Sequence, residues 1–356
     1  MNPERYFRPE VLNVKGYHLD KRACQIKLDQ NENPFGFPDF LKEKFFARVK
    51  TLDWARYPDF QMESLNQKIA RFTDLPADKV LVGNGSNSLI QAVLVATLSP
   101  GDQIIVSEPT FTLYGLTGKI LGAEVISCLL HPEGFSLPME EILLASRSPR
   151  AKVLVLCTPN NPTGNNFPLG DIRVLLQQFP GLVMIDEAYH EFSRQDAKPL
   201  LREFENLVIL RTFSKAMAMA ALRVGYLMAA PEICAQVRKV RLPYSVNLFS
   251  ELAAELVLEE TDQLYRFVRE IIQQRDELAP RLRAFSFLRV YPSDANFFLV
   301  RAQNGPALFQ WLLRAGILAR DVSGYPGLEN CLRFSVGTAE QNRKLLESLE
   351  RFSVAR

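Results

Sequence analysis

The stretch "AKVLVLCTPNNPTG" (151–164) joins an apolar run to a polar turn that contains two prolines and a glycine. The apolar part is continuous rather than alternating, which is typical of a strand buried on both faces. The turn follows at once, so the polar side chains lie at the carboxyl end of that strand. This pattern predicts a sheet covered by helices on both sides.

Similar apolar runs lie on both sides of this stretch. They are "KVLVG" (79–83), "QIIVS" (103–107), "GLVMIDEAY" (181–189), "NLVILRTFSK" (206–215) and "VGYLMAA" (224–230). Helix-like segments separate most of them, and "SNSLIQAVLVATL" (86–98) is the clearest. The alternation predicts an α/β fold with a mostly parallel central sheet and helices on both faces.

The sequence pattern changes after "LPYSVN" (242–247): amphipathic helix-like segments become more frequent and apolar runs become fewer. The turn-rich "NENPFGFP" (31–38) precedes the first expected helix of the α/β part. We therefore expect a large α/β domain over 41–241. The N-terminal arm, 1–40, together with 242–356, forms a smaller α+β domain.

Composition excludes several classes of protein. The net charge of the 356 residues is +2, without the basic excess that is typical of nucleic-acid binding. Five dispersed cysteines without a CxxC pair indicate free thiols, and three histidines without metal-site spacing give no reason to expect a metal. The charged N-terminus and the lack of a long apolar run lead us to expect a cytoplasmic protein without a membrane span.

Polar residues follow each apolar run, at the edge of the sheet where ligands bind in folds of this class. They are Ser86, Asn87, Tyr114, Asn161, Asp186, Tyr189, Ser214, Lys215 and Arg223. Each has an ordinary structural explanation when taken singly, such as a helix cap, a turn, a packed ring or a solvated lysine. Their convergence on one edge indicates a binding site.

A phosphorylated aromatic aldehyde with a ring nitrogen fits this set of side chains. Lys215 can form a Schiff base with an aldehyde, and Asp186 can keep the ring nitrogen protonated. Tyr114 can stack on the ring. A helix start, Ser214 and Arg223 can hold the phosphate. The sequence therefore predicts pyridoxal 5′-phosphate as cofactor.

Four of the motifs, "NNPTG", "DEAY", "TFSK" and "LRVGY", resemble the signature of the fold-type-I (class I/II) pyridoxal-phosphate aminotransferases. Four others, "LDQNENPFG", "RYPD", "GNGS" and "LRFSVGT", are similar to the histidinol-phosphate aminotransferase branch. The similarity extends from about residue 15 to the C-terminus, so it covers nearly the whole chain.

The resemblance implies a role for each matching residue. Lys215, Asp186 and Tyr189 would be catalytic, with the lysine amine moving the α-proton of the substrate. Cofactor contacts would come from Ser86, Asn87, Tyr114, Asn161, Asp186, Tyr189, Thr212, Ser214, Lys215 and Arg223, and Tyr57 would reach the phosphate of the neighbouring subunit in a homodimer. Substrate contacts would come from Tyr17, Asn33, Arg320 and Arg333, of which Arg333 holds the α-carboxylate or its equivalent and Arg320 the distal phosphate.

The chain departs from its apparent relatives at two places. Asn87 and Ser88 stand where relatives usually have an acidic pair. After Lys215 the chain reads "AMAMAAL", where relatives tend to carry glycines and where alanine favours a helix.

We expect transfer of an amino group from L-histidinol phosphate to 2-oxoglutarate, a step of histidine biosynthesis. An aromatic amino-acid aminotransferase is the first alternative. A phosphothreonine-type decarboxylase is the second, and a nucleotide-binding α/β protein that has lost catalysis is the third.

Overall fold

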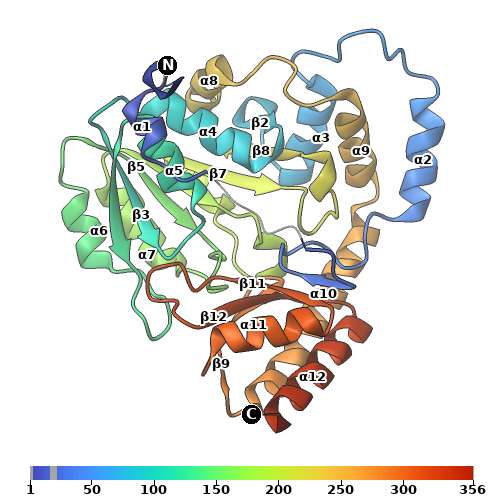
Figure 1. Cartoon of the computed structure of the whole chain (residues 1–356). Helices are drawn as coiled ribbons and strands as arrows, with labels where there is room; N and C mark the ends of the chain where they lie inside the picture. The colour runs from blue at the N-terminus through green and yellow to red at the C-terminus, as the bar shows by residue number, and fades with distance from the viewer. Residues whose placement is uncertain (1–2, 17–21, 356) are drawn as a thin grey trace.

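The computed structural model describes residues 3–16 and 22–355, and within them the central sheet has seven strands (Figure 1). The strands are β2 (Val80–Gly83), β3 (Gln103–Glu108), β4 (Glu124–Leu129), β5 (Ala151–Cys157), β6 (Leu182–Asp186), β7 (Leu207–Thr212) and β8 (Gly225–Ala229). Their order is β2-β8-β7-β6-β5-β3-β4. All neighbouring strands from β7 to β4 are parallel, and β8 is antiparallel to both of its neighbours. The predicted mostly parallel sheet is confirmed.

Helices cover both faces of this sheet. One face packs against α4 (Gly85–Thr97), α5 (Leu113–Ile120) and α8 (Pro231–Val240). The other packs against α3 (Glu63–Thr73), α6 (Met139–Ala145), α7 (Leu169–Gln178) and α9 (Leu248–Glu259). In β5, Val153 and Val155 belong to the first cluster, and Leu154 and Leu156 to the second. The strand is apolar throughout because both of its faces are buried.

A second sheet, with five strands among the described residues, lies below the first in Figure 1. Its order is β1-β11-β12-β10-β9. The strands are β1 (Ile26–Leu28), β9 (Leu288–Val290), β10 (Phe297–Ala302), β11 (Ile317–Asp321) and β12 (Cys331–Ser335). The helices α10 (Thr261–Arg283), α11 (Gly305–Arg314) and α12 (Ala339–Val354) pack against it. The strand β1 pairs in parallel with β11, so the N-terminal arm belongs to this sheet.

The remaining elements lie mostly at the periphery. They are η1 (Pro3–Tyr6), α1 (Pro9–Leu12), α2 (Asp39–Val49), η2 (Ala77–Lys79), η3 (His190–Phe192), η4 (Lys198–Arg202) and η5 (Ala220–Leu222).

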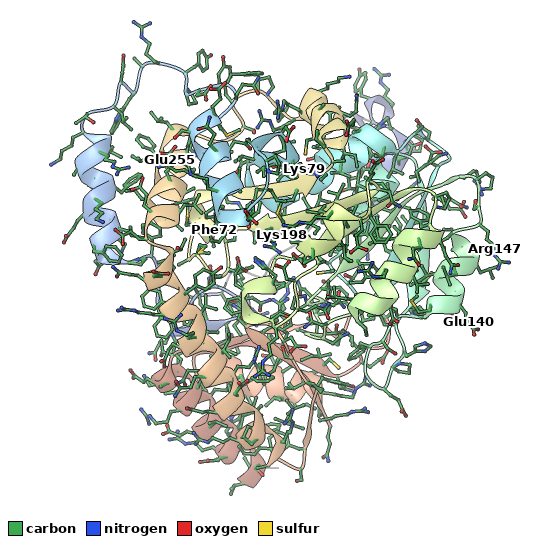
Figure 2. All side chains as sticks on the ribbon, turned by 180° about the vertical axis from the view of Figure 1, so that it is seen from behind. Phe72, Lys79, Glu140, Arg147, Lys198 and Glu255 are labelled. Atoms are coloured by element: carbon green, nitrogen blue, oxygen red, sulfur yellow. The ribbon has the colours of Figure 1, made fainter. Side chains whose placement is uncertain are left out.

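Figure 2 shows Glu255 of α9 at the back of the molecule, where Lys68 of α3 pairs with Glu255 at 3.0 Å. Within the described part of the chain, none of the helices has the length and apolar character that a membrane crossing needs.

The segment after Lys215 differs from the helix that its alanines favour. Only the single 3-10 turn η5 forms there. Ala218 and Arg223 have φ of +56° and +55°, and this left-handed backbone cannot continue an α-helix. The segment therefore turns sharply and brings Arg223 back beside the end of β7.

Candidate active site

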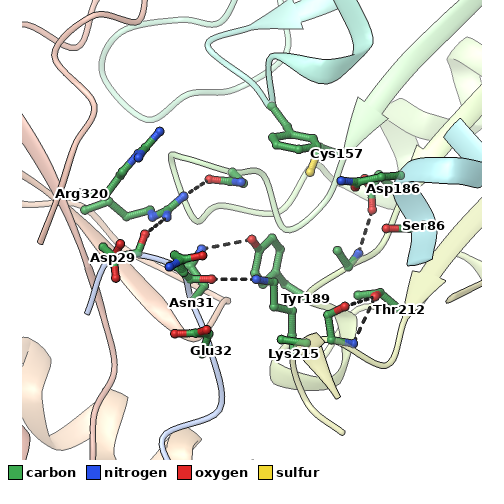
Figure 3. Close-up of a pocket in the computed structure, with 18 of the residues that line it drawn as sticks. Asp29, Asn31, Glu32, Ser86, Cys157, Asp186, Tyr189, Thr212, Lys215 and Arg320 are labelled. Carbon is green, nitrogen blue, oxygen red and sulfur yellow. Dashed lines mark hydrogen bonds between the residues drawn. The ribbon is translucent and has the colours of Figure 1, made fainter. Parts of the chain in front are cut away.

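A cavity of about 370 Å³ lies between the two sheets, at the carboxyl ends of β5, β6 and β7 (Figure 3). Of the residues predicted for the site, it is lined by Ser86, Asn87, Tyr114, Asn161, Asp186, Tyr189, Thr212, Ser214, Lys215, Arg223, Arg320 and Arg333. The segment 29–32 of the N-terminal arm closes one side. The size and the mixture of apolar and convergent polar groups suit a small-molecule site.

Lys215 follows β7, whose end delivers its side chain into the cavity. Its Nζ donates a hydrogen bond to the backbone oxygen of Gln30, at 2.7 Å. Burial lowers the pKa of the Lys215 ammonium from 10.5 to about 8, and the positive charge of Arg333 acts in the same direction. The amine is therefore much closer to its neutral, nucleophilic form at physiological pH than an ordinary lysine is.

Asp186 is the last residue of β6 and is 4% exposed. Its Oδ2 accepts a hydrogen bond from the Tyr114 hydroxyl at 2.7 Å, and its Oδ1 accepts one from the Ala188 amide at 3.0 Å. Burial raises the pKa of the Asp186 carboxyl from 3.8 to about 6. A cationic N–H group in the cavity would favour the ionised carboxylate, and Lys215 opens onto the same cavity.

The structure gives Tyr114 a hydrogen-bonding contact beside its predicted stacking role, which stays a prediction. It lines the cavity, but its side chain is 0% exposed and its hydroxyl donates to Asp186. Phe111, which the sequence analysis missed, also lines the cavity and is only partly buried. The two rings meet edge to face with their centroids 5.7 Å apart. Phe111 is thus an aromatic ring that can cover a planar ligand.

The first turn of α4 opens toward the cavity. Its N-cap, Asn84, makes no side-chain capping bond, so the Asn84 side chain does not compete with an anion for the first amides of the helix. Ser86 and Asn87 of that turn line the cavity. Ser88, at one of the two departures from the relatives, instead donates its hydroxyl to the Gly85 oxygen at 3.0 Å within the helix.

Two glycines permit a close approach of backbone and guanidinium beside this turn. A Cβ on Gly85, whose φ is +70°, would lie 2.6 Å from Arg223 Nη2. A Cβ on Gly225 would lie 2.5 Å from the Ser86 nitrogen. Arg223 Nη1 donates to Ser214 Oγ at 3.1 Å, and Thr212 Oγ1 donates to the same oxygen at 2.9 Å. Amides, hydroxyls and a guanidinium thus converge as a phosphate site requires.

Two arginines of the second sheet face the cavity. Arg320 of β11 and Arg333 of β12 stand directly opposite each other in the antiparallel register. Arg333 donates to the Asp29 backbone oxygen at 2.6 Å and to Asn161 Oδ1. Like charges opposite each other destabilise a strand pair. An anionic ligand between them would offset that cost.

Tyr189 is 4% exposed and packs edge to face on Phe297, with centroids 5.2 Å apart. Its hydroxyl oxygen accepts a hydrogen bond from Asn31 Nδ2 at 3.1 Å. Burial raises the pKa of the Tyr189 hydroxyl above its usual 10, so it is a hydrogen-bond donor at neutral pH. Asn31 was missed by the sequence analysis, although it belongs to the "NENPFG" motif.

Two predicted residues of the described part of the chain, Asn33 and Tyr57, do not line the cavity. The side chain of Asn33 donates a hydrogen bond to the Ala216 backbone oxygen and accepts one from the Phe35 amide, both at 3.0 Å. Both of these partners are backbone groups. Tyr57 is 81% exposed and stacks on Tyr244, with centroids 4.6 Å apart. Tyr17 lies outside the described residues.

A buried ion pair that the sequence analysis also missed lies beside the site. Arg211, immediately before Thr212, pairs through Nη2 with Glu187 Oε2 at 2.7 Å, and both side chains are almost fully buried. Glu187 directly follows Asp186. The pair therefore ties the ends of β6 and β7 together next to the residues that face the cavity.

Pyridoxal 5′-phosphate fits the groups that are present. Lys215 can meet its aldehyde, Asp186 its ring nitrogen, and the start of α4 with Ser214 and Arg223 its phosphate. The Gly85 and Gly225 cradle, which any side chain would fill, supports the phosphate position independently of the motifs. Among the residues that the structure describes, no cluster of His, Cys, Asp and Glu side chains could hold a metal ion.

Comparison with known proteins supports the family and the cofactor. The family model of the class I and II aminotransferases matches residues 23–349. A histidinol-phosphate aminotransferase of Chlorobium phaeovibrioides is 37% identical over 347 residues, which are 97% of this chain and 96% of that protein.

Two crystal structures of histidinol-phosphate aminotransferases are similar to the whole chain. The enzyme from Clostridium acetobutylicum has a TM-score of 0.85 at 26% identity, over 93% of this chain and all of that one. The enzyme from Sinorhizobium meliloti, solved in complex with pyridoxal-5′-phosphate, has a TM-score of 0.87 over 98% of both chains. Its identity of 22% supports the fold alone.

Proposed function

The chain belongs to the class I and II aminotransferases, and from that premise we propose that it is a pyridoxal-5′-phosphate-dependent histidinol-phosphate aminotransferase of histidine biosynthesis. It transfers the amino group of L-histidinol phosphate to 2-oxoglutarate and yields imidazole acetol phosphate and L-glutamate. The substrate assignment rests on one observation: Arg320 and Arg333 face the same cavity from adjacent strands.

Both substrates offer an anion to these cationic contacts, one phosphate in histidinol phosphate and two carboxylates in 2-oxoglutarate. Histidinol phosphate carries a phosphate at the end distant from its reacting carbon, and 2-oxoglutarate carries a second carboxylate there. Arg320 binds this distal anion in each case, and Arg333 orients the end near the reacting carbon, bidentately where a carboxylate is present. A guanidinium suits both anions because its planar fork matches carboxylate and phosphate oxygens.

The remaining roles follow from the contacts in the cavity. The bound cofactor supplies an electron-poor ring that accepts the electrons left when the substrate α-proton departs. Lys215 Nζ takes that proton and returns it, since burial lowers its pKa to about 8 and so raises the neutral share of the amine far above that of an ordinary lysine. Asp186 holds the ring nitrogen protonated, and Tyr189 and Asn161 contact the ring oxygen. Phe111 covers the ring face.

The phosphate of the cofactor is held by the amides of Ser86 and Asn87, by the hydroxyls of Thr212 and Ser214, and by Arg223. Tyr57 completes this set in the neighbouring subunit of a homodimer. The exposure of Tyr57 supports this role, because Tyr57, Phe60 and Tyr244 form an aromatic group on the surface of a single chain.

The protein is cytoplasmic. The proposed division has a large domain over 41–241 and a small one that combines 1–40 with 242–356, although α9 of the latter segment packs against the central sheet.

Substrate preference tests the proposal. The wild-type protein is assayed with L-histidinol phosphate, L-histidinol, and aromatic amino acids as donors, with 2-oxoglutarate as acceptor. We expect kcat/KM to be highest for histidinol phosphate, and Arg320→Gln to remove most of that preference over histidinol. Arg289→Gln, an arginine of the same sheet outside the cavity, serves as control.

Two results would contradict the assignment. Equal kcat/KM for histidinol and histidinol phosphate in the wild-type protein would show that no side chain recognises the substrate phosphate. A preference for aromatic amino acids over histidinol phosphate would favour the aromatic aminotransferase instead.

A further inference from the structure

The backbone and side chains of residues 29–31 contact three functional side chains in succession. The Asp29 oxygen accepts from Arg333 and the Gln30 oxygen accepts from Lys215. Asn31 then donates its amide to Tyr189 (Figure 3). The first two contacts use only backbone, whereas the third depends on the residue type at position 31.

Asn31 makes more hydrogen bonds than its position in a loop requires. It is fully buried, and each of its four polar atoms is hydrogen-bonded. Its backbone N–H donates to Ser335 Oγ at 2.9 Å, and its backbone oxygen accepts from Asn296 Nδ2 at 3.0 Å. Its φ of +54° lies in the left-handed region, which asparagine tolerates better than most residues. The backbone is thus fixed on the second sheet, and the side chain points at Tyr189.

The direction of each hydrogen bond follows from Ser335. Its Oγ accepts from the Asn31 N–H, and its proton is donated to Asn31 Oδ1 at 3.1 Å. The side-chain amide of Asn31 therefore turns its NH₂ toward Tyr189. The reversed amide would leave the Ser335 proton without an acceptor among the described residues.

The bond from Asn31 occupies a lone pair of the Tyr189 oxygen. Tyr189 cannot then donate its own proton to Asn31, so that proton is left for a group in the cavity. Under the proposed function, on which this inference rests, that group is the ring oxygen of the cofactor.

We propose that Asn31, oriented by Ser335, is a positioning residue that commits the Tyr189 hydroxyl to donate toward the cofactor ring. Asn31 itself need not touch the cofactor. A donor aimed at the ring oxygen stabilises negative charge on that oxygen and so lowers the pH at which the bound cofactor loses its proton. Without Asn31 the Tyr189 hydroxyl can turn, and the proton is retained to higher pH.

The test is a spectrophotometric pH titration of the protein with bound pyridoxal 5′-phosphate, in a double-mutant cycle of Asn31→Gly and Tyr189→Phe. Glycine is chosen because it adopts the left-handed backbone of position 31 without strain. We expect Asn31→Gly to raise the midpoint of the absorbance change by about 0.5–1 pH unit, the size of one hydrogen bond. In the Tyr189→Phe background the same change should cause no further shift.

Asn330→Gly is the matched control, since Asn330 also has a left-handed φ, of +60°, and lies outside the cavity. It should leave the midpoint unchanged. If Asn31→Gly fails to fold, Ser335→Ala takes its place, because it removes the group that orients the amide, and a smaller rise is expected.

Equal shifts in both backgrounds, or none in the wild-type background, would overturn the inference and leave the proposed function intact. A wild-type protein that shows no cofactor absorbance at all would refute the proposed function and this inference with it.

Discussion

The hydrogen bond between Tyr114 and Asp186 gives the most quantitative prediction. Tyr114→Phe keeps the fully buried ring and deletes the hydroxyl that lies 2.7 Å from Asp186 Oδ2. A hydrogen bond to an ionised group contributes about 1.5–3 kcal/mol. Its loss destabilises only the charged carboxylate, because the protonated acid needs the donor much less.

The size of the effect follows from the pKa of Asp186, which burial already raises to about 6. Losing about 1.5–3 kcal/mol corresponds to a further rise of roughly 1–2 pH units. At pH 7 the ionised fraction in the cofactor-free protein then falls from about 90% to between about 50% and 10%. If the ionised carboxylate is the form that holds the ring nitrogen, affinity for pyridoxal 5′-phosphate falls about 2- to 10-fold at pH 7.

The assay is the dissociation constant of the cofactor, measured by fluorescence titration from pH 6 to pH 9. The defect should shrink as pH rises, because both proteins ionise fully above the shifted pKa. Tyr226→Phe is the control, since Tyr226 is 3% exposed and lies outside the cavity. Its affinity should follow the wild type at every pH.

A defect in Tyr114→Phe that is the same at pH 6 and pH 9 would refute this reasoning. It would mean that the hydroxyl acts through packing of the site rather than through the charge of Asp186. A thermal melting curve checks that both variants are folded.

Three further predictions concern other parts of the site. The rate at which cofactor-free protein captures pyridoxal 5′-phosphate should rise with pH around a midpoint near 8, since only the neutral Lys215 amine attacks an aldehyde; a stopped-flow midpoint at the ordinary 10.5 would contradict the burial effect. Gly225→Ala places a Cβ 2.5 Å from the Ser86 nitrogen and should weaken inorganic-phosphate binding about tenfold in calorimetry, unlike Gly115→Ala, whose nearest contact is 3.5 Å. Arg211→Leu leaves Glu187 buried without its cation, also breaks the ion pair with Asp196, and should lower the free energy of unfolding by about 3–5 kcal/mol in urea. Most of this loss should be recovered in the double variant Arg211→Leu/Glu187→Leu, and a loss that persists in full there would argue against an effect of the buried pair.

Most strands of the central sheet were predictable because a strand that is buried on both faces has a continuous run of apolar residues. The same runs located Asp186 and Lys215, since each is the polar residue that follows a strand at the shared edge. The edge strand β4 was missed for the complementary reason. Most of its residues are exposed or only partly buried, and Ser127 interrupts its apolar residues.

The contacts that the sequence could not supply join segments that are far apart in the chain. Asn31 meets Tyr189 only because β1 pairs with β11, a contact that no local pattern encodes. The different burial of Phe111 and Tyr114 depends on which ring the start of α5 turns into the core. The alanines after Lys215 favour helix locally, but the return of Arg223 to the phosphate site requires a left-handed turn.

The central claim is that the amine of Lys215 is the point of attachment for pyridoxal 5′-phosphate. Borohydride reduction of the loaded protein, followed by peptide mapping in a mass spectrometer, tests it directly. We predict a single modified peptide, bearing the cofactor on Lys215, and no modification in Lys215→Arg. A label on a different lysine, or the same labelling in Lys215→Arg, would contradict the claim.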